Sequence, residues 1–169
     1  MGNIVLIGMP SCGKSTMGVL IAKNLGLKFL DSDLLIQERE GKLLHELIKE
    51  RGNEEFIKIE NDANMSIDVQ NTVISTGGSV VYCEGAMKHL SDIGKIVYIK
   101  ISYETLAARL GDYVHRGVVM PAGYTLLDMY HERAALYEKY AEYTLDTDNM
   151  TMTETLDALS ELCKKAILE

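Results

Sequence analysis

The chain has 169 residues, of which 47% are hydrophobic and two are proline, and its formal net charge is −8 at pH 7. This length suits one domain over residues 1–169, and the acidic balance disfavours nucleic acid as a partner, because phosphate-backbone binding rests on clustered Lys and Arg. No run approaches the ~18 to 20 apolar residues of a membrane span, and the three cysteines show no disulfide or metal-ligand spacing. We therefore expect a cytoplasmic protein that binds neither nucleic acid nor a membrane.

The N-terminal stretch combines a strand pattern, a glycine motif and a helix pattern. Residues 3–7 form a short apolar run, residues 8–16 fit Gly-x-x-x-x-Gly-Lys-[Ser/Thr], and the following helical spacing ends near Gly26. Strand, tight loop and helix together point successive backbone N–H groups into one concavity, and the helix N-terminus adds its positive dipole end. Because a strand pattern precedes the glycine motif and a helix pattern follows it, a chance match to the motif is disfavoured. The sequence therefore predicts a nucleotide phosphate site, a P-loop.

Each residue type in this loop has a separate role. Gly8 and Gly13 permit backbone angles and a close phosphate approach that a Cβ would block. Lys14 places a compact charge on the β- and γ-phosphates of ATP, and the Ser15 hydroxyl ligates Mg²⁺. The ATP-binding residues predicted in the loop are Gly8, Pro10, Ser11, Cys12, Gly13, Lys14, Ser15 and Thr16.

A second strand pattern at residues 27–30 runs directly into Asp31-Ser32-Asp33. Carboxylates just past the carboxyl end of a strand lie where open α/β sheets bind ligands. We expect Asp31 to hold Mg²⁺ or its water shell, and Asp33 to accept a proton from a substrate hydroxyl. The alternative is a helix cap of Asx type, since Asp often begins helices, and the two roles are compatible.

The middle of the chain is a helical segment of about residues 34–67, with a break at Gly52 and Asn53, followed by a third strand at residues 72–75. The segment that follows this strand, residues 76–79, has the sequence Thr-Gly-Gly-Ser. Paired glycines there bring backbone amides close to a ligand, and the alternative is an ordinary turn.

A fourth strand is predicted at residues 96–101 and a helix carrying Arg109 at 103–110. The glycine-rich segment of about residues 111–124 contains Arg116 and lacks periodicity. Loops of this length are lids, binding loops or disordered segments, and beside ATP a lid is favoured, because phosphoryl transfer must exclude water.

The C-terminal part reads as a long helix over residues 126–143 that contains Arg133, a fifth strand at residues 143–146 and a last helix from Thr153. Strands that alternate with helices imply a parallel sheet with helices on both faces. The fold class expected is α/β: a three-layer α/β/α P-loop NTPase fold with a five-stranded parallel sheet and a mobile lid.

Taken in order, these residues resemble the shikimate kinases, small P-loop kinases of the nucleoside-monophosphate-kinase fold, over nearly the whole chain. Residues 8–16 are similar to the family's phosphate loop, residues 31–33 to its Asp-x-Asp motif and residues 75–78 to the start of its glycine triplet. Phe56 and Glu60 match a helix that lies on the substrate. The resemblance implies transfer of the ATP γ-phosphoryl group to the 3-hydroxyl of shikimate, with Mg²⁺, by a monomer.

Three arginines fall on family positions as well. Arg109 matches an adenine-stacking arginine, Arg116 the lid arginine and Arg133 an arginine that binds the substrate carboxylate. The resemblance thus implies three sets of site residues outside the loop's ATP contacts. The catalytic residues are Lys14, Asp33 and Arg116, and the metal-binding residues are Ser15 and Asp31. The substrate-binding residues are Asp33, Phe56, Gly77, Gly78, Ser79 and Arg133. Arg109 joins the ATP-binding residues of the loop.

The chain departs from the family pattern on the acceptor side. Ile57 stands where the family has a second carboxylate-binding arginine, and Ser79 stands for the third glycine of the triplet. The neighbouring Lys58 lies about 100° further round a helix and would face elsewhere. Loss of one charge-assisted pair, roughly 1.5–3 kcal/mol, weakens acceptor binding about ten- to a hundredfold unless something compensates. The alternatives are a kinase of another small hydroxylated metabolite and an ATP-binding module without turnover, and intact Lys14 and Asp33 disfavour the module.

Overall fold

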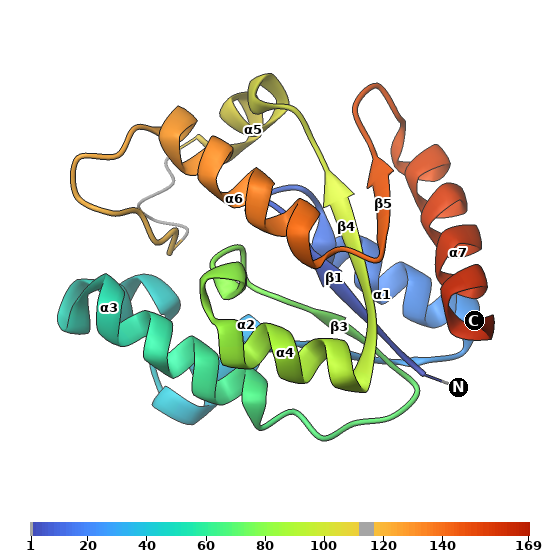
Figure 1. Ribbon diagram of the computed structural model, residues 1–169, viewed down its shortest axis with the longest axis horizontal. Coiled ribbons are helices and arrows are strands. Elements are labelled where there is room, and N and C mark those ends of the chain that lie inside the picture. Colours follow the sequence, from blue (N-terminus) through green and yellow to red (C-terminus); the bar gives the residue numbers. More distant parts are fainter. Residues whose placement is uncertain (1, 112–116) are drawn as a thin grey trace.

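The computed structural model describes residues 2–111 and 117–169 and contains one five-stranded sheet. All neighbouring strands pair in parallel, in the order β2-β3-β1-β4-β5, so β1 lies at the centre (Figure 1). Both β1 and β3 consist wholly of buried residues, as expected of parallel strands covered on both faces. The strands are β1 (Asn3–Ile7), β2 (Lys28–Asp31), β3 (Thr72–Ser75), β4 (Gly94–Lys100) and β5 (Tyr143–Asp146).

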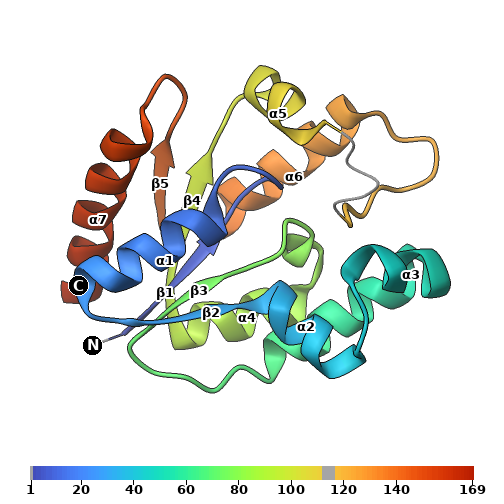
Figure 2. The same ribbon diagram turned by 180° about the vertical axis from the view of Figure 1, so that it is seen from behind.

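Helices cover both faces of this sheet. On one face, α1 packs against α7; on the other, α4 and α6 lie over β4, and the two views show these layers from opposite sides (Figures 1 and 2). The helical segment of α2 and α3 extends beyond the β2 side, where α3 packs on α4. The helices are α1 (Lys14–Leu25), α2 (Ser32–Glu40), α3 (Leu44–Met65), the 3₁₀ turn η1 (Val80–Tyr82), α4 (Glu84–Ile93), α5 (Tyr103–Leu110), α6 (Leu126–Tyr140) and α7 (Met152–Leu168).

The buried apolar side chains form two clusters. The first surrounds the sheet and includes four of the five residues of β1 and the central four residues of β4. The second, which we call the acceptor-side cluster, lies between α2, α3 and the segment that follows residue 116. Its buried members are Ile36, Leu47, Phe56, Ala63 and Val119.

The predicted fold class, with its five parallel strands between two helical layers, is confirmed. Several bounds differ: β2 includes Asp31, α6 ends at Tyr140 and α3 continues through Gly52, whose positive φ of 79° kinks it. The helix α4 was not predicted, although Ala86, Met87 and Leu90 form its buried face. Among the described residues, no helix is long and apolar enough to cross a membrane.

Candidate active site

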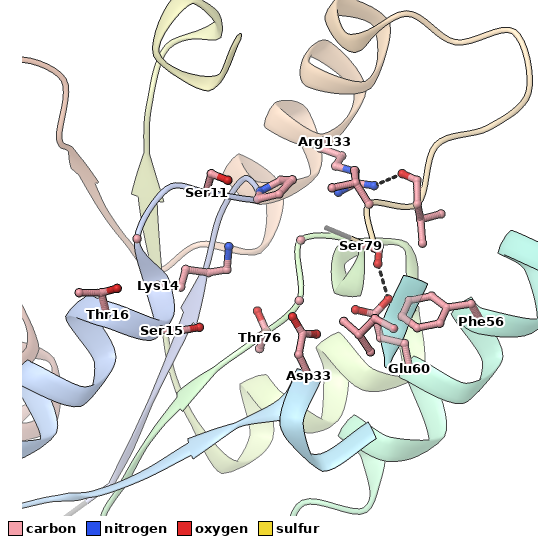
Figure 3. A pocket seen from close by; sticks show the side chains of 18 residues that line it. Ser11, Lys14, Ser15, Thr16, Asp33, Phe56, Glu60, Thr76, Ser79 and Arg133 are labelled. Carbon is pink, nitrogen blue, oxygen red and sulfur yellow. Dashed lines mark hydrogen bonds between the residues drawn. The ribbon is translucent and has the colours of Figure 1, made fainter. Parts of the chain in front are cut away.

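A cavity of about 320 Å³ lies at the carboxyl ends of β1, β2 and β3 (Figure 3). Five parts of the chain meet there: the loop before α1, the first turn of α2, the middle of α3, the turn after β3 and α6. Residues 117–119 complete the lining. Most of the predicted site residues therefore converge on one cavity, although they are spread over more than a hundred positions of the sequence.

The phosphate loop has the backbone that its motif requires. Gly8 has a φ of +151°, and a Cβ there would lie 2.6 Å from the carbonyl oxygen of Ile99. The helix α1 begins at Lys14, so its first N–H groups face the loop. The Nζ atom of Lys14 donates hydrogen bonds to the carbonyl oxygens of Gly8 and Met9, at 2.7 and 2.8 Å. The loop thus presents a buried ammonium group and helix N–H groups on one side of the cavity, an arrangement suited to an anion.

Ser15 and Asp31 meet beside the loop. The Ser15 hydroxyl donates to Oδ2 of Asp31 at 2.6 Å, while Oδ1 of Asp31 accepts from the backbone N–H of Asp33 at 2.9 Å. One carboxylate therefore caps α2, as the alternative interpretation of Asp31 required, and also contacts the predicted metal-binding serine; the metal role of Asp31 stays a prediction. Hydroxyl and carboxylate oxygens are ligands that suit Mg²⁺, which takes its remaining ligands from phosphates and water. In the described parts of the chain, no three His, Cys, Asp or Glu side chains converge as a metal site.

Asp33 faces the turn after β3 from the first turn of α2. Burial, helped by the charge of Asp31, raises the pKa of Asp33 to about 6, and the charge of Lys14 opposes this shift. A Cβ on Gly77 would lie 2.8 Å from Oδ1 of Asp33, which explains why the turn needs glycine at this position. A carboxyl group with this pKa is ionised at pH 7.5 and can still accept a proton.

Arg133 reaches the opposite side of the cavity from α6. It is 1% exposed, its Nη2 donates to the carbonyl oxygen of Val119 at 2.5 Å, and its guanidinium lies 5.3 Å from the ring centroid of Tyr82. Within the described residues its Nε has no hydrogen-bond partner. Gly78 approaches so closely that a Cβ there would lie 3.0 Å from Nη1. A buried guanidinium with a free donor beside a cavity suits an anionic ligand.

Glu60 is a site residue to which the sequence assigned no chemical role beyond its match to a substrate-covering helix. It lies on the same face of α3 as Phe56, four residues earlier, and both line the cavity. Its side chain is 1% exposed, and the Ser79 hydroxyl donates to its Oε2 at 2.5 Å. Burial raises the pKa of Glu60 to about 7, against the lowering effect of the Ser79 hydrogen bond. Helical spacing from Phe56 was the available sequence signal.

Several predicted residues do not line the cavity. Arg109 is exposed on α5, and Gly8 and Cys12 belong to the loop but do not reach the cavity. Asp31 lies behind Ser15 and Asp33, which line the cavity and are hydrogen-bonded to it. Arg116 lies outside the described residues. Ile57 packs against both hydrophobic clusters and lines a shallow surface groove with Tyr82, so its side chain points away from the acceptor cavity.

The match to a protein family decides between the remaining interpretations of this cavity. The shikimate kinase family model matches residues 10–164, which is most of the chain. The chain belongs to the shikimate kinase family. As a shikimate kinase, it is a phosphotransferase with an alcohol group as acceptor, it takes part in aromatic amino acid biosynthesis and it uses ATP.

Similar proteins cover nearly the whole chain. A shikimate kinase of Clostridium botulinum (strain Alaska E43 / Type E3) is 35% identical over 98% of this chain and 97% of its own length. A shikimate kinase of Moorella thermoacetica is 32% identical over 96% of this chain and 95% of its own length. Among solved structures, shikimate kinase from Acinetobacter baumannii in complex with shikimate has a TM-score of 0.84 at 26% identity, covering 99% of this chain and 93% of that one. Shikimate kinase from Aquifex aeolicus has a TM-score of 0.79 at 28% identity, covering 98% of each.

Proposed function

We propose that this shikimate kinase transfers the γ-phosphoryl group of Mg-ATP to the 3-hydroxyl of shikimate. The observation that carries the proposal is the placement of Asp33 and Arg133 in the same cavity as Lys14. The Asp33 carboxylate can accept a hydrogen bond from a hydroxyl, the Arg133 guanidinium can bind a carboxylate, and the Lys14 ammonium group can bind a phosphate. These are the functional groups of shikimate and of ATP.

On the nucleotide side, the loop holds the phosphates and Lys14 meets the transferring group. Its ammonium, now bonded to loop carbonyl oxygens, exchanges these neutral partners for charged phosphate oxygens. Ser15 and Asp31 would hold Mg²⁺, and the ion would supply positive charge for the phosphate oxygens. Thr16 and Pro10 also line the cavity.

On the acceptor side, Asp33 accepts the hydrogen bond of the reacting hydroxyl and then its proton. Arg133 binds the carboxylate of shikimate with the donors that face the cavity, and Phe56 packs against the ring. Gly77 and Gly78 bring backbone to the acceptor where a side chain would collide with Asp33 or Arg133. Held in this way, the acceptor oxygen lies in line with the γ-phosphorus, and positioning supplies most of the catalysis.

Two arginines complete the proposed ATP site. Arg116, in the segment of about residues 111–124, offsets charge that develops between donor and acceptor, and Arg109 stacks on the adenine. Gly117–Val119, which belong to that segment, line the cavity, so a lid closing there excludes water from the reacting groups. We further propose that the protein works as a monomer in the cytoplasm, where its three free and buried cysteines stay reduced.

The test is coupled ADP release by the purified protein with Mg-ATP, with and without millimolar shikimate, beside the variant Asp33→Asn. We expect a strong shikimate-dependent rate in the wild type and its loss in the variant, with ATP binding retained in both. ATP binding without any shikimate dependence would refute the proposal and direct attention to other small polyols and hydroxy acids. Failure to consume ATP with any acceptor would instead indicate a binding module.

A further inference from the structure

The charge of Arg133 is buried on the wall of the cavity. Its side chain is 1% exposed, and among the described residues no Asp or Glu forms a salt bridge with it. Its Nη2 donates to the carbonyl oxygen of Val119, which is neutral, and its Nε has no hydrogen-bond partner in the described chain. Burying a charge without pairing it costs a large free energy. Another kind of group must therefore stabilise this guanidinium before a ligand arrives.

The ring of Tyr82 faces this guanidinium. Tyr82 ends the 3₁₀ turn η1, in which Val80 and Val81 are buried, and the Cζ atom of Arg133 lies over its ring at 5.3 Å from the centroid. The face of an aromatic ring is negative and attracts a cation, most strongly where water is excluded. Burial raises the pKa of Tyr82 to about 12, so the side chain is neutral at pH 7. The attraction therefore comes from the ring and not from a phenolate.

This arrangement stabilises the cation and leaves its donors available. A carboxylate of the protein would occupy N–H groups of Arg133, whereas a ring face supplies no oxygen to accept them. Gly78 comes so close to Nη1 that a Cβ there would lie 3.0 Å away, and both residues line the cavity. Of the described Lys and Arg side chains, Lys14 is the other one that lines it, from the phosphate loop (Figure 3). Binding of an acceptor's carboxylate thus depends on one guanidinium.

The far side of Tyr82 borders the shallow surface groove that Ile57 and Lys58 line. Tyr82 lines this groove as well and Arg133 does not, so the Tyr82 side chain separates the guanidinium from the surface. Without the ring, the guanidinium would be free to turn towards the groove and become hydrated. Molecules in that orientation must first return the guanidinium to the cavity before they bind a carboxylate, which lowers the apparent affinity.

We propose that Tyr82 is a positioning residue of the acceptor site: its ring holds the Arg133 guanidinium towards the cavity, so that a single arginine binds the acceptor's carboxylate. The inference rests on the proposed function, in which Arg133 binds that carboxylate, and it adds a residue that does not line the cavity itself. The ring would thereby offset part of the affinity that an apolar side chain at residue 57 removes.

The test measures kcat and KM by coupled ADP release for shikimate and for its methyl ester, which lacks the carboxylate charge. Tyr82→Leu removes the ring and Tyr82→Phe keeps it. The matched control is Tyr140→Leu, which removes a half-buried ring on α6, outside the cavity, whose centroid lies 5.1 Å from Nζ of Lys139.

We expect Tyr82→Leu to raise the KM of shikimate about five- to thirtyfold, which corresponds to the loss of a desolvated cation–π pair. Its kcat and its KM values for the ester and for ATP should change little. Tyr82→Phe and Tyr140→Leu should resemble the wild type. Equal rises for shikimate and its ester would overturn the inference, because they indicate general damage. An unchanged KM of shikimate would overturn it too, and so would a Tyr82→Phe that behaves like Tyr82→Leu.

A second measurement needs no turnover and separates this inference from the proposed function. The Nε–H signal of Arg133, identified by its absence in Arg133→Lys, is followed by NMR in the ligand-free protein. We expect Tyr82→Leu to shift this signal and to speed its exchange with water, while Tyr82→Phe preserves it. If the wild type does not phosphorylate shikimate, the proposed function fails, yet a signal that responds in this way still upholds the pair, and a signal that Tyr82→Leu leaves unchanged overturns it.

Discussion

The substitution Glu60→Gln should make the protein more stable at pH 8 and leave its stability unchanged at pH 4. Burial raises the pKa of Glu60 from 4.5 to about 7, so the native state binds a proton more tightly than the unfolded chain does. Below pH 4.5 both states are protonated and the charge has no effect. Between pH 4.5 and 7 the unfolded chain releases a proton that the native state keeps, so stability falls as the pH rises. Above about pH 7 the full destabilisation is present.

The size of the effect follows from this pKa shift. At about 1.4 kcal/mol per pKa unit, ionised Glu60 destabilises the fold by about 3 kcal/mol. Glutamine is neutral at every pH, has nearly the same shape and can still accept the hydrogen bond of Ser79. We therefore expect Glu60→Gln to gain 2 to 3 kcal/mol at pH 8, or about 4 to 12 °C in Tm for a chain of this size.

The assay is urea unfolding at pH 4, 5, 6, 7 and 8 without ligands, followed by circular dichroism. The matched control is Glu55→Gln on the same helix, where the carboxylate is half-exposed and paired with Lys58. The control should change the free energy of unfolding by less than about 1 kcal/mol at any pH. A destabilised Glu60→Gln at pH 8, or a gain of equal size at pH 4 and pH 8, would refute the reasoning.

Three further predictions concern activity. Lys14→Ala should lower kcat about a hundred- to a thousandfold in the ADP-release assay, because the transferring phosphoryl group loses its cation, and an unchanged kcat would remove Lys14 from the chemistry. Arg133→Lys should raise the KM of shikimate about ten- to a hundredfold with little change for ATP, since an ammonium group cannot form a bidentate pair with a carboxylate; equal changes in both KM values would contradict this. The rate with shikimate should fall below about pH 6 as Asp33 becomes protonated, and an acid limb near pH 4 in the pH profile would contradict its role as proton acceptor.

Local patterns were enough to predict the sheet and the phosphate loop. The apolar run of β1, the glycines of the loop and the strand before Asp31 each lie within about ten residues, and each pattern has few structural alternatives. The carboxyl ends of parallel strands meet at one edge, so Asp33 and Gly77 were expected near the loop without any knowledge of distant contacts.

Long-range contacts could not be predicted in this way. The hydrogen bond from Ser79 to Glu60 joins β3's turn to α3, and that from Arg133 to the Val119 carbonyl joins α6 to the segment after residue 116. No sequence period encodes either pair. The helix α4 was missed because it follows the glycine turn after a short 3₁₀ turn, without a side-chain cap.

The substitution at residue 57 illustrates the same limit. On a helix, Ile57 lies about 100° from the face that Phe56 and Glu60 share, and the structure places it against the two apolar clusters. The departure from the family at this position therefore alters the packing of α3 directly.

The two hydrophobic clusters divide the domain into parts of unequal local stability. The nucleotide loop is built on the large cluster around the sheet, whereas Phe56 and Val119 belong to the acceptor-side cluster of five buried residues. Small clusters open more often, so we expect amide hydrogens around α3 to exchange with solvent faster than those of β1. If shikimate binds against the small cluster as proposed, it should slow that exchange more than ATP does. On the proposed function, the acceptor half of the enzyme would be consolidated by its own substrate.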